Sequence, residues 1–282
     1  MTQIIYILGC RGMAGSMIHK YLIMKGYHVI GLSREEFDAS SADWHMKFLS
    51  FDSGSILINC IGIIPQKVGN IDKNLDIYTE INSKFTHKLA EYCNAANIQL
   101  IHLSTNCVFE EGPSDENKKP NALDIYGQTK GAGEPVGCHV IRTSIIGPEP
   151  FGPKVSLLEW FLKQTGDCRG YTNHIWNGIT TLELAKYIET LLIVPAIPPR
   201  VVHLFSTNSL SKYQLLEYIS IVYKKTCKLI PFETSEKVNT TLQSVSESLI
   251  QKTIEQQIIE LKEFNDHQDY AHLEGKDSLN LL

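Results

Sequence analysis

Residues 4–15 of the chain read IIYILGCRGMAG. The apolar run at the start of this stretch predicts a buried strand, and apolar residues at helical spacing follow it. Three glycines join the two elements with the spacing GxxGxxG: Gly9 permits a tight turn, Gly12 lets backbone approach a pyrophosphate, and Gly15 lets the helix pack closely. A glycine-rich turn in any strand–helix unit is the alternative. At the first strand–helix junction, however, the stretch predicts a dinucleotide site at a helix N-terminus.

Strand and helix signals alternate over the first half of the chain. Short apolar runs predict strands, and segments with apolar residues every three or four positions predict helices. The predicted strands are 4–8, 29–32, 56–60, 98–103 and 139–143, and the predicted helices are 12–25, 70–96 and 124–133. This order is typical of an α/β fold, a Rossmann-like doubly wound parallel sheet with helices on both faces.

The second half changes character after residues 147–153, which contain three prolines. Helices are predicted at 155–165, 180–194, 209–225 and 246–264, and short strands near 168–171, 201–205 and 228–231. We therefore predict a dinucleotide-binding domain over 1–150, which also receives later segments such as 173–205. Residues 151–282 are predicted to form mainly a smaller, mostly helical cap that binds the substrate.

Composition narrows the class of protein. Apolar residues make up 43% of the chain, charged residues 20%, and the net charge is −5, which disfavours nucleic acid as a partner. The sequence contains no apolar run of the roughly 20 residues that a membrane helix needs, and no basic leader. Seven scattered cysteines without a CxxC pair disfavour a disulfide framework and a zinc site, and no carboxylate cluster predicts a metal. A cytoplasmic protein is expected.

The residues after the second predicted strand indicate which dinucleotide binds. Folds that prefer NAD usually place Asp or Glu there, to accept from the ribose 2′-hydroxyl. Here that strand ends in Ser33-Arg34, and an arginine suits a 2′-phosphate. Arg11, within the glycine loop, lies where it can reach the same phosphate. NADPH is therefore predicted, and NADH is the alternative if Glu35 or Glu36 takes the ribose.

Tyr126 and Lys130 lie four residues apart, on one face of a predicted helix. With 12 tyrosines and 21 lysines, about one such pair is expected by chance, and the chain has a second, Tyr21 and Lys25. The second pair lies in the glycine-loop helix, and we interpret it as the chance occurrence. Tyr126 instead follows a strand that ends in Ser104-Thr105, at the carboxyl edge where open α/β sheets bind ligands.

These side chains suit the reduction of a carbonyl group. When hydride reaches the carbonyl carbon, the oxygen must gain a proton, and tyrosine has an ordinary pKa of about 10. An ammonium nearby lowers that pKa, so Lys130 is expected to activate Tyr126 while bonding the nicotinamide ribose. The hydroxyl of Thr105 is expected to hold the carbonyl oxygen. A core tyrosine and a solvated lysine are the structural alternative.

Together these residues resemble the extended short-chain dehydrogenase/reductases, and more narrowly the dTDP-4-dehydrorhamnose reductase family. The matching segments run in the family's order over about 180 residues: GCRGMAGSM (9–17), NCIGII (59–64), IHLSTNCVF (101–109), DIYGQTKGAGE (124–134), IRTSIIG (141–147) and WNGITTLELA (176–185). The resemblance implies an oxidoreductase that reduces the C4 ketone of a nucleotide-linked 4-keto-6-deoxyhexose in deoxysugar biosynthesis.

The resemblance also implies the site residues. Thr105, Tyr126 and Lys130 match the family's catalytic triad. Predicted cofactor contacts come from Gly9, Arg11, Gly12, Met13, Ser33, Arg34, Cys60, Ile61, Gly62, Ser104, Tyr126 and Lys130. Predicted substrate contacts come from Thr105, Asn106, Cys107, Tyr126, Asn173, Trp176 and Asn177. The nucleotide, the sugar and the choice between monomer and homodimer stay open.

Several residues allow more than one interpretation. Many relatives carry Asp where this chain has Asn106. Cys107 matches a cysteine of GDP-fucose synthase. With His174 as the partner of Cys107, this match predicts an epimerase/reductase as the second function. A catalytically idle NADPH-binding regulatory protein is the third. Trp176 suits a core anchor between domains as well as a substrate contact. Arg142 suits a diphosphate contact or a salt bridge, and Asn82 an active-site support or a solvated helix position.

Overall fold

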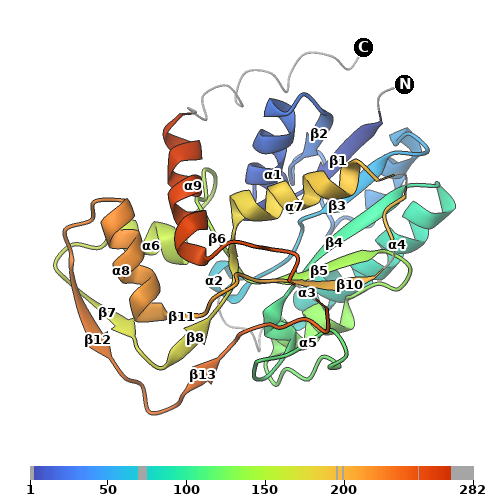
Figure 1. Ribbon diagram of the computed structural model, residues 1–282. Coiled ribbons are helices and arrows are strands. Elements are labelled where there is room, and N and C mark those ends of the chain that lie inside the picture. Colours follow the sequence, from blue (N-terminus) through green and yellow to red (C-terminus); the bar gives the residue numbers. More distant parts are fainter. Residues whose placement is uncertain (1–2, 69–74, 195, 199, 247, 268–282) are drawn as a thin grey trace.

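The computed structural model describes residues 3–68, 75–194, 196–198, 200–246 and 248–267. Its centre is a six-stranded sheet in the order β10-β5-β4-β3-β1-β2 (Figure 1). Every neighbouring pair in this sheet is parallel. The strands are β1 (Ile4–Leu8), β2 (His28–Leu32), β3 (Ile56–Asn59), β4 (Gln99–Thr105), β5 (His139–Thr143) and β10 (Val201–Leu204). All six segments were predicted within two residues at each end.

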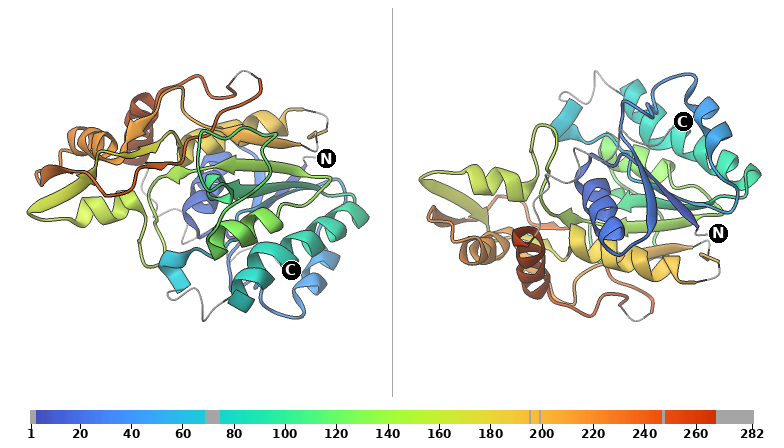
Figure 2. Two further views of the ribbon diagram at one scale, coloured as in Figure 1. Left: turned by 90° about the horizontal axis from the view of Figure 1, so that it is seen from below. Right: turned by 90° about the horizontal axis from the view of Figure 1, so that it is seen from above.

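Helices cover both faces of the sheet (Figure 2). Helices α1 (Met13–Met24) and α7 (Thr181–Leu192) pack against each other on one face. Helices α3 (Leu75–Thr79), α4 (Phe85–Ala95) and α5 (Ile125–Ala132) cover the other, where a single π-helical segment, η2 (Glu80–Lys84), joins the first two. The predicted doubly wound Rossmann-like fold is confirmed.

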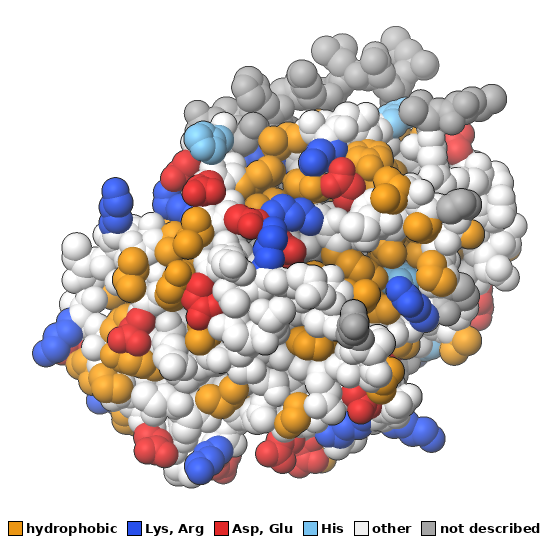
Figure 3. Space-filling view, in the orientation of Figure 1, with side chains coloured by type: hydrophobic (Ala, Val, Ile, Leu, Met, Phe, Trp, Pro, Cys, Tyr) orange, Lys and Arg blue, Asp and Glu red, His pale blue; other side chains and the backbone are white. Residues whose placement is uncertain are grey.

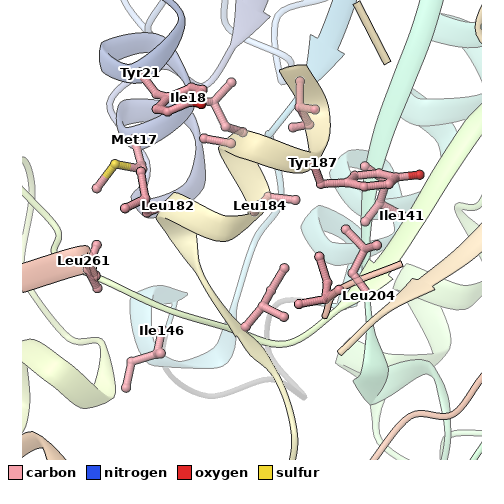
Figure 4. Packing of buried hydrophobic residues seen from close by; sticks show 14 of the residues in the cluster. Met17, Ile18, Tyr21, Ile141, Ile146, Leu182, Leu184, Tyr187, Leu204 and Leu261 are labelled. Atoms are coloured by element: carbon pink, nitrogen blue, oxygen red, sulfur yellow. The ribbon is translucent and has the colours of Figure 1, made fainter. Parts of the chain in front are cut away.

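Alternate residues of the buried strands supply the two halves of the core. In β1, Ile5 and Ile7 face α1 and α7, whereas Tyr6 and Leu8 face α4. On the first face, Met17 and Ile18 of α1 pack near Leu182 and Leu184 of α7, above strand residues Ile141 and Leu204 (Figure 4). Burial on both faces explains why these strands read as continuous apolar runs rather than as alternating patterns.

The remaining elements form a smaller unit beside the sheet. It contains α6 (Leu157–Lys163), α8 (Lys212–Val222) and α9 (Ile254–Asp266), with β7 (Asp167–Tyr171) parallel to β12 (Lys228–Phe232). Strand β8 (His174–Trp176) lies between β11 (Leu210–Ser211) and β13 (Val238–Asn239). Two short strands, β6 (Ile145–Ile146) and β9 (Ile179–Thr180), pair at the junction, and α2 (Pro65–Val68) follows β3. Because α7 and β10 pack with the central sheet, the chain crosses between the units more than once. The domain boundary at residue 150 stays a prediction.

Local capping explains where the predicted helix ends were wrong. Helix α9 begins at Ile254 rather than at 246, because Thr253 and Gln256 form a capping box there. Helix α8 begins at Lys212 rather than at 209, because Leu210–Ser211 form β11 and Ser211 caps the helix. Of the helix predicted at 70–96, residues 70–74 lie outside the described residues, and the rest is divided by the π-helical segment.

Two observations bear on partners. Among the described residues, the structure has no helix of the length and apolarity that crossing a membrane requires. On the face drawn in Figure 3, lysine and arginine side chains are interspersed with aspartate and glutamate rather than gathered in one basic area.

Candidate active site

The glycine loop lies at the point where the strand order reverses. The chain passes from β1 to β2 on one side and continues from β3 to β4 on the other, so a crevice forms between the carboxyl ends of β1 and β3. Gly9 adopts a positive φ of +75°, and its N–H donates to the carbonyl of Leu32 at 2.8 Å. A Cβ on Gly15 would lie 2.3 Å from the Gly9 carbonyl oxygen. Both glycines are therefore required by the turn itself, as predicted.

Helix α1 begins at this crevice without a side-chain cap. Its N-cap residue is Gly12, which bonds back to the Gly9 carbonyl at 2.9 Å. The N–H groups of the first helical turn, from Met13 onward, have no intrahelical acceptor. Together with the helix dipole they favour an anion, so the predicted phosphate site has the geometry that it needs.

A mainly apolar pocket of about 190 Å³ lies beside the loop. Its lining residues are Gly9, Arg34, Phe37, Asp38, Ala39, Ser40, Ile61, Gly62, Ile63, Ile77 and Ile81. Such a pocket suits the adenine end of a dinucleotide. Four of the predicted cofactor residues line this pocket: Gly9, Arg34, Ile61 and Gly62. Cys60, which directly follows β3, is half-buried next to Ile61.

The charged residues after β2 are arranged around Arg34. Its side chain is 77% exposed and pairs with Asp38 at 3.3 Å. Arg11 pairs with Glu35 at 3.1 Å, and Glu36 accepts hydrogen bonds from both the N–H and the hydroxyl of Ser33. The bond from the Ser33 hydroxyl lowers the pKa of the Glu36 carboxyl. Ser33 is buried and its side chain is bonded inside this turn, and its predicted contact with the cofactor stays a prediction.

The three predicted catalytic residues meet at the carboxyl end of β4. Thr105 is the last residue of β4, and Tyr126 and Lys130 lie on α5, which Asp124 caps by accepting from the N–H of Gly127 at 2.9 Å. A Cβ on Gly127 would lie 2.1 Å from the carbonyl oxygen of Cys107. The helix can therefore pack directly on the turn after β4, which brings the Tyr126 hydroxyl into a hydrogen bond with that of Thr105.

Lys130, one helical turn after Tyr126 on α5, is buried. Its side chain reaches the carbonyl of Leu103, to which the ammonium donates at 2.8 Å. A Cβ on Gly62 would lie 3.7 Å from its Nζ, so this glycine leaves space between the lysine and the cofactor crevice. Burial lowers the pKa of Lys130 to about 8, while the nearby Glu134 carboxylate acts in the opposite direction.

The pKa of Tyr126 differs from the prediction. We expected Lys130 to lower it, but burial raises the pKa of Tyr126 above its usual range, and the neighbouring Cys107 thiol acts in the same direction. The hydrogen bond from Thr105 lowers the pKa only in part. The phenol is consequently protonated at neutral pH, which is the state that a proton donor requires.

Asn82 supports the site from the π-helical segment. It is fully buried, accepts from the N–H of Ile63 at 2.8 Å and donates to the Ile63 carbonyl at 3.1 Å. Its amide also lies 3.4 Å from the Thr129 hydroxyl on α5. Of the two interpretations of Asn82, the structure has the supporting one, because the amide ties the loop after β3 to the helix that carries Tyr126.

Ser104 and Arg142 belong to a buried ion-pair network instead of facing a ligand. Arg142 donates to both carboxylate oxygens of Glu134, at 2.8 and 2.6 Å, and the Ser104 hydroxyl donates to the same carboxylate at 2.6 Å. The Ser104 hydroxyl is thus already bonded within the chain, and the predicted cofactor contact of Ser104 stays a prediction. Arg142 has the structural role, because its partner lies within the chain.

Several predicted substrate contacts hold the smaller unit together. Asn173 donates to the carbonyl of Thr234 at 2.8 Å, and Asn177 exchanges two hydrogen bonds with the backbone of Leu242. Asn106 donates to the carbonyl of Thr240 at 2.8 Å. Trp176 is 2% exposed and donates to the Ser144 hydroxyl at 2.7 Å. Backbone groups already occupy the amides of Asn173 and Asn177, which does not favour their predicted substrate contacts. These contacts stay predictions, and Trp176 is the core anchor.

A lysine that the sequence analysis did not single out faces the same site. Lys212, the first residue of α8, places its ammonium 4.6 Å from the centre of the Trp176 ring. Burial lowers the pKa of His174, and the charge of Lys212 acts in the same direction. The same charge acts to lower the pKa of half-buried Cys107, but burial raises that pKa overall. Nothing in the sequence distinguishes this residue from the other 20 lysines. Only the pairing of β11 with β8 brings it opposite Trp176.

No group of three or more histidine, cysteine, aspartate or glutamate side chains gathers at metal-binding distance in the described part of the chain. A separate cleft of about 550 Å³ lies at the amino-terminal ends of β4 and β5, lined in part by Gln99 and His139. It contains none of the predicted site residues.

Comparison with known families agrees with this geometry. The model of the RmlD substrate binding domain family matches residues 2–146, just over half of the chain. The chain belongs to this family. The resemblance to dTDP-4-dehydrorhamnose reductases that the motifs indicated is thereby confirmed.

Individual relatives of this RmlD-family chain match over part of their length. The dTDP-4-dehydrorhamnose reductase of Mycolicibacterium smegmatis is 29% identical over 154 residues, which cover 51% of this chain and 46% of that protein. A probable low-salt glycan biosynthesis reductase, Agl14 of Haloferax volcanii, is 24% identical over 59% of this chain and 57% of its own. The chain thus spans about half the length of the curated relatives it matches.

The fold matches over a longer stretch. The crystal structure of dTDP-4-dehydrorhamnose reductase from Bacillus anthracis, in complex with NADP, superimposes with a TM-score of 0.80. The match covers 93% of this chain and 99% of that one, at 18% sequence identity. At this identity the likeness concerns the fold.

Proposed function

We propose that this chain uses NADPH to reduce the C4 ketone of a nucleotide-linked 4-keto-6-deoxyhexose, with a dTDP- or UDP-sugar as the expected substrate. The observation that carries the proposal is the meeting of Thr105 and Tyr126 at the end of β4, with Lys130 of the same helix buried against Leu103 and next to Gly62 of the glycine-loop crevice. The reductase names of relatives, including the dTDP-4-dehydrorhamnose reductase of M. smegmatis, support the same class of reaction.

The crevice residues fit a dinucleotide. The close approach of Gly15 to Gly9, the uncapped start of α1 and the apolar pocket near Arg34 suit the pyrophosphate and the adenosine. We propose that Met13, Ile61 and Gly62 line this cofactor. When bound, NADPH supplies a hydride.

Two side chains of this protein bind the ketone oxygen and protonate it. Thr105 donates its hydroxyl hydrogen bond to that oxygen, and Tyr126, protonated because burial raises its pKa, gives it a proton. The Lys130 ammonium favours the phenolate that remains and bonds the nicotinamide ribose. Cys107, half-buried beside Tyr126, contributes to the wall on the substrate side.

The arrangement after β2 supports NADPH over NADH. Glu36 is bonded to Ser33, so this carboxylate is already used within the turn, whereas Glu35 with Arg11 and Arg34 with Asp38 form exposed ion pairs. Arg34 stands at the rim of the adenosine pocket with most of its side chain exposed. A guanidinium there suits the 2′-phosphate through charge-assisted hydrogen bonds.

The experiment is a substrate panel in D₂O. Loss of the reduced-nicotinamide absorbance is followed with UDP-, dTDP- and GDP-4-keto-6-deoxy sugars, with and without a 2-acetamido group. Rapid oxidation of NADPH by one member is expected, with a product reduced at C4. NADPH binding without oxidation by any member would contradict the proposal and favour the idle regulatory protein.

The same panel distinguishes the epimerase/reductase. Deuterium at C3 or C5 of the product, above a control without enzyme, would assign that second function through Cys107. In the structure His174 Nε2 lies 2.9 Å from the Thr234 hydroxyl, and its ring lies 4.5 Å from that of Tyr171. These contacts do not favour His174 as the partner of Cys107, so simple reduction remains the proposal. A homodimer and a cytoplasmic location stay predictions.

A further inference from the structure

Lys212 is held in place by the strands around it. Strand β11 pairs antiparallel with β8, so Leu210 lies opposite Trp176 and Ser211 opposite Ile175. Ser211 then caps α8 in a capping box with Gln214. Lys212, the first helical residue, follows this cap, and its ammonium lies 4.6 Å from the centre of the Trp176 ring. Strand pairing and the helix cap fix the backbone that carries this side chain.

The ammonium of Lys212 has no acceptor among the described residues. Apart from the face of the Trp176 ring, its electrostatic neighbours are the Cys107 thiol and the His174 ring. Neither is an anion at neutral pH. A half-buried ammonium without a counter-charge is costly, since burial removes the water that would solvate it. Arg142, another buried cation of this chain, has a carboxylate partner, so Lys212 differs from it in leaving its partner to be supplied from outside.

Lys212 also lines a cleft of about 660 Å³ in the smaller unit. Tyr171 and Trp160 line this cleft, and each is 41% exposed although its ring is large and apolar. Exposed aromatic faces beside a cation suit a planar base followed by a phosphate. Arg169 and Asp167 balance each other's charge in the lining, which leaves Lys212 as the excess positive charge.

We propose that Lys212 binds the diphosphate of the nucleotide-linked substrate, between the catalytic trio and the aromatic cleft. The inference rests on the proposed function for its substrate class. The Cys107 thiol is an electrostatic neighbour of both Lys212 and Tyr126, beside which the sugar ketone would react, and Lys212 also lines the cleft that contains Tyr171. A compact ammonium is a good partner for phosphate oxygens and a poor one for an uncharged sugar.

The test is a binding measurement that needs no turnover. Calorimetric titrations with UDP, dTDP, thymidine and inorganic pyrophosphate are compared for the wild type and Lys212→Met, in the presence of NADPH. We expect Lys212→Met to bind its preferred nucleoside diphosphate about 10- to 100-fold more weakly, because a charge-assisted bond is lost. Thymidine should bind both proteins equally. Lys212→Arg should retain most of the affinity.

The control is Lys237→Met, which removes an exposed lysine of the same unit and should bind like the wild type. Thermal unfolding of each variant shows that it folds. Unchanged diphosphate affinity in Lys212→Met would overturn the inference, as would an equal loss for thymidine, which would mean that the residue only packs on Trp176. Pyrophosphate binding as tightly as the nucleoside diphosphates would overturn the nucleotide part.

Failure of the proposed function is distinguishable from failure of this inference. If no keto sugar is reduced but Lys212→Met still loses nucleoside diphosphate affinity, the binding site stands and the reaction is wrong. If a keto sugar is reduced and its KM is the same in Lys212→Met, the reaction stands and the role of Lys212 is wrong. If the wild type binds no nucleoside diphosphate, the inference falls.

Discussion

Two helices of this protein carry the same spacing of tyrosine and lysine, in very different surroundings. Tyr126 is the second residue of α5, whereas Tyr21 is the ninth residue of α1. In a strand–helix unit the helix begins at the carboxyl edge of the sheet and runs back along it, so at ~1.5 Å per residue Tyr21 lies about 12 Å below that edge. Position along the helix, rather than the pattern, separates a candidate catalytic pair from a structural one.

The immediate contacts show the same contrast. The Tyr21 hydroxyl donates to Glu189 on α7 at 2.5 Å, and Lys25 is half-exposed, 3.8 Å from the same carboxylate. Both side chains therefore tie two helices of the core together. Tyr126 instead meets the Thr105 hydroxyl, and buried Lys130 donates to the Leu103 carbonyl beside Gly62 of the crevice. Tyr126 and Lys130 therefore lie where a ligand in the crevice can bond them, whereas Tyr21 and Lys25 both contact Glu189.

The largest effect should come from removing the Tyr126 hydroxyl. Tyr126→Phe is expected to lower kcat about 10³-fold while NADPH binds almost normally, because the proton donor is lost and the phosphate site is untouched. The measurement is NADPH oxidation with the substrate that the panel identifies, together with a fluorescence titration of NADPH. Turnover near that of the wild type would contradict the role of Tyr126 as proton donor, and the Tyr126–Lys130 pair would then be no more catalytic than the Tyr21–Lys25 pair.

The pH dependence should follow Lys130. Its pKa is lowered to about 8 by burial, so the lysine is charged below that pH and loses its charge as the pH rises through it. If the ammonium stabilises the phenolate of Tyr126, kcat should be level below about pH 8 and fall about tenfold per unit above it. Lys25→Met should show the same profile as the wild type. A profile that stays flat to pH 10 would contradict the role of Lys130.

The cofactor end of the crevice offers a smaller effect. Arg34→Ala is expected to weaken NADPH binding about tenfold, since a charge-assisted contact with the 2′-phosphate is lost. NADH serves as the matched ligand, because it lacks that phosphate and should bind both proteins equally. Titrations with the two cofactors make the comparison. An equal loss for NADPH and NADH would place Arg34 outside the phosphate site.

The smallest catalytic effect is expected at the structural pair. Tyr21→Phe should leave kcat within about twofold of the wild type, yet lower the free energy of unfolding by about 1–2 kcal/mol, because a hydrogen bond to a carboxylate is lost. Urea unfolding measures the stability, and NADPH oxidation measures the activity. A large loss of turnover without a loss of stability would mean that α1 takes part in the reaction.

The sequence predicted the parts of the site that depend on local geometry. A glycine loop after the first strand, a strand ending in Ser104-Thr105 and a helix starting at Asp124 need only neighbouring residues and the rule that parallel strands end at one edge. It also predicted the strand β10 and most helices, because buried apolar runs and helical spacing are local signals. It missed β6, β8, β9, β11 and β13, which are two or three residues long and carry too few side chains to show a period.

Tertiary structure decided which polar groups remain for ligands. The sequence placed Asn173, Asn177 and Ser104 near the site, and the fold then occupied them with Thr234, Leu242 and Glu134, residues 30 or more positions away. The tertiary structure also decided the direction in which the pKa of Tyr126 shifts: burial of the phenol raises it more than the nearby hydrogen bond lowers it.

Lys212 is a candidate site residue that only the tertiary structure reveals. Its sequence context is that of any lysine at a helix start, and it faces Cys107 and Trp176 only because two short strands pair. The sequence by itself determined the fold class, the glycine crevice and the Thr105, Tyr126 and Lys130 set, since these follow from the order of strands and helices. Whether a polar side chain is free or already bonded depends on distant partners, which only the folded chain brings together.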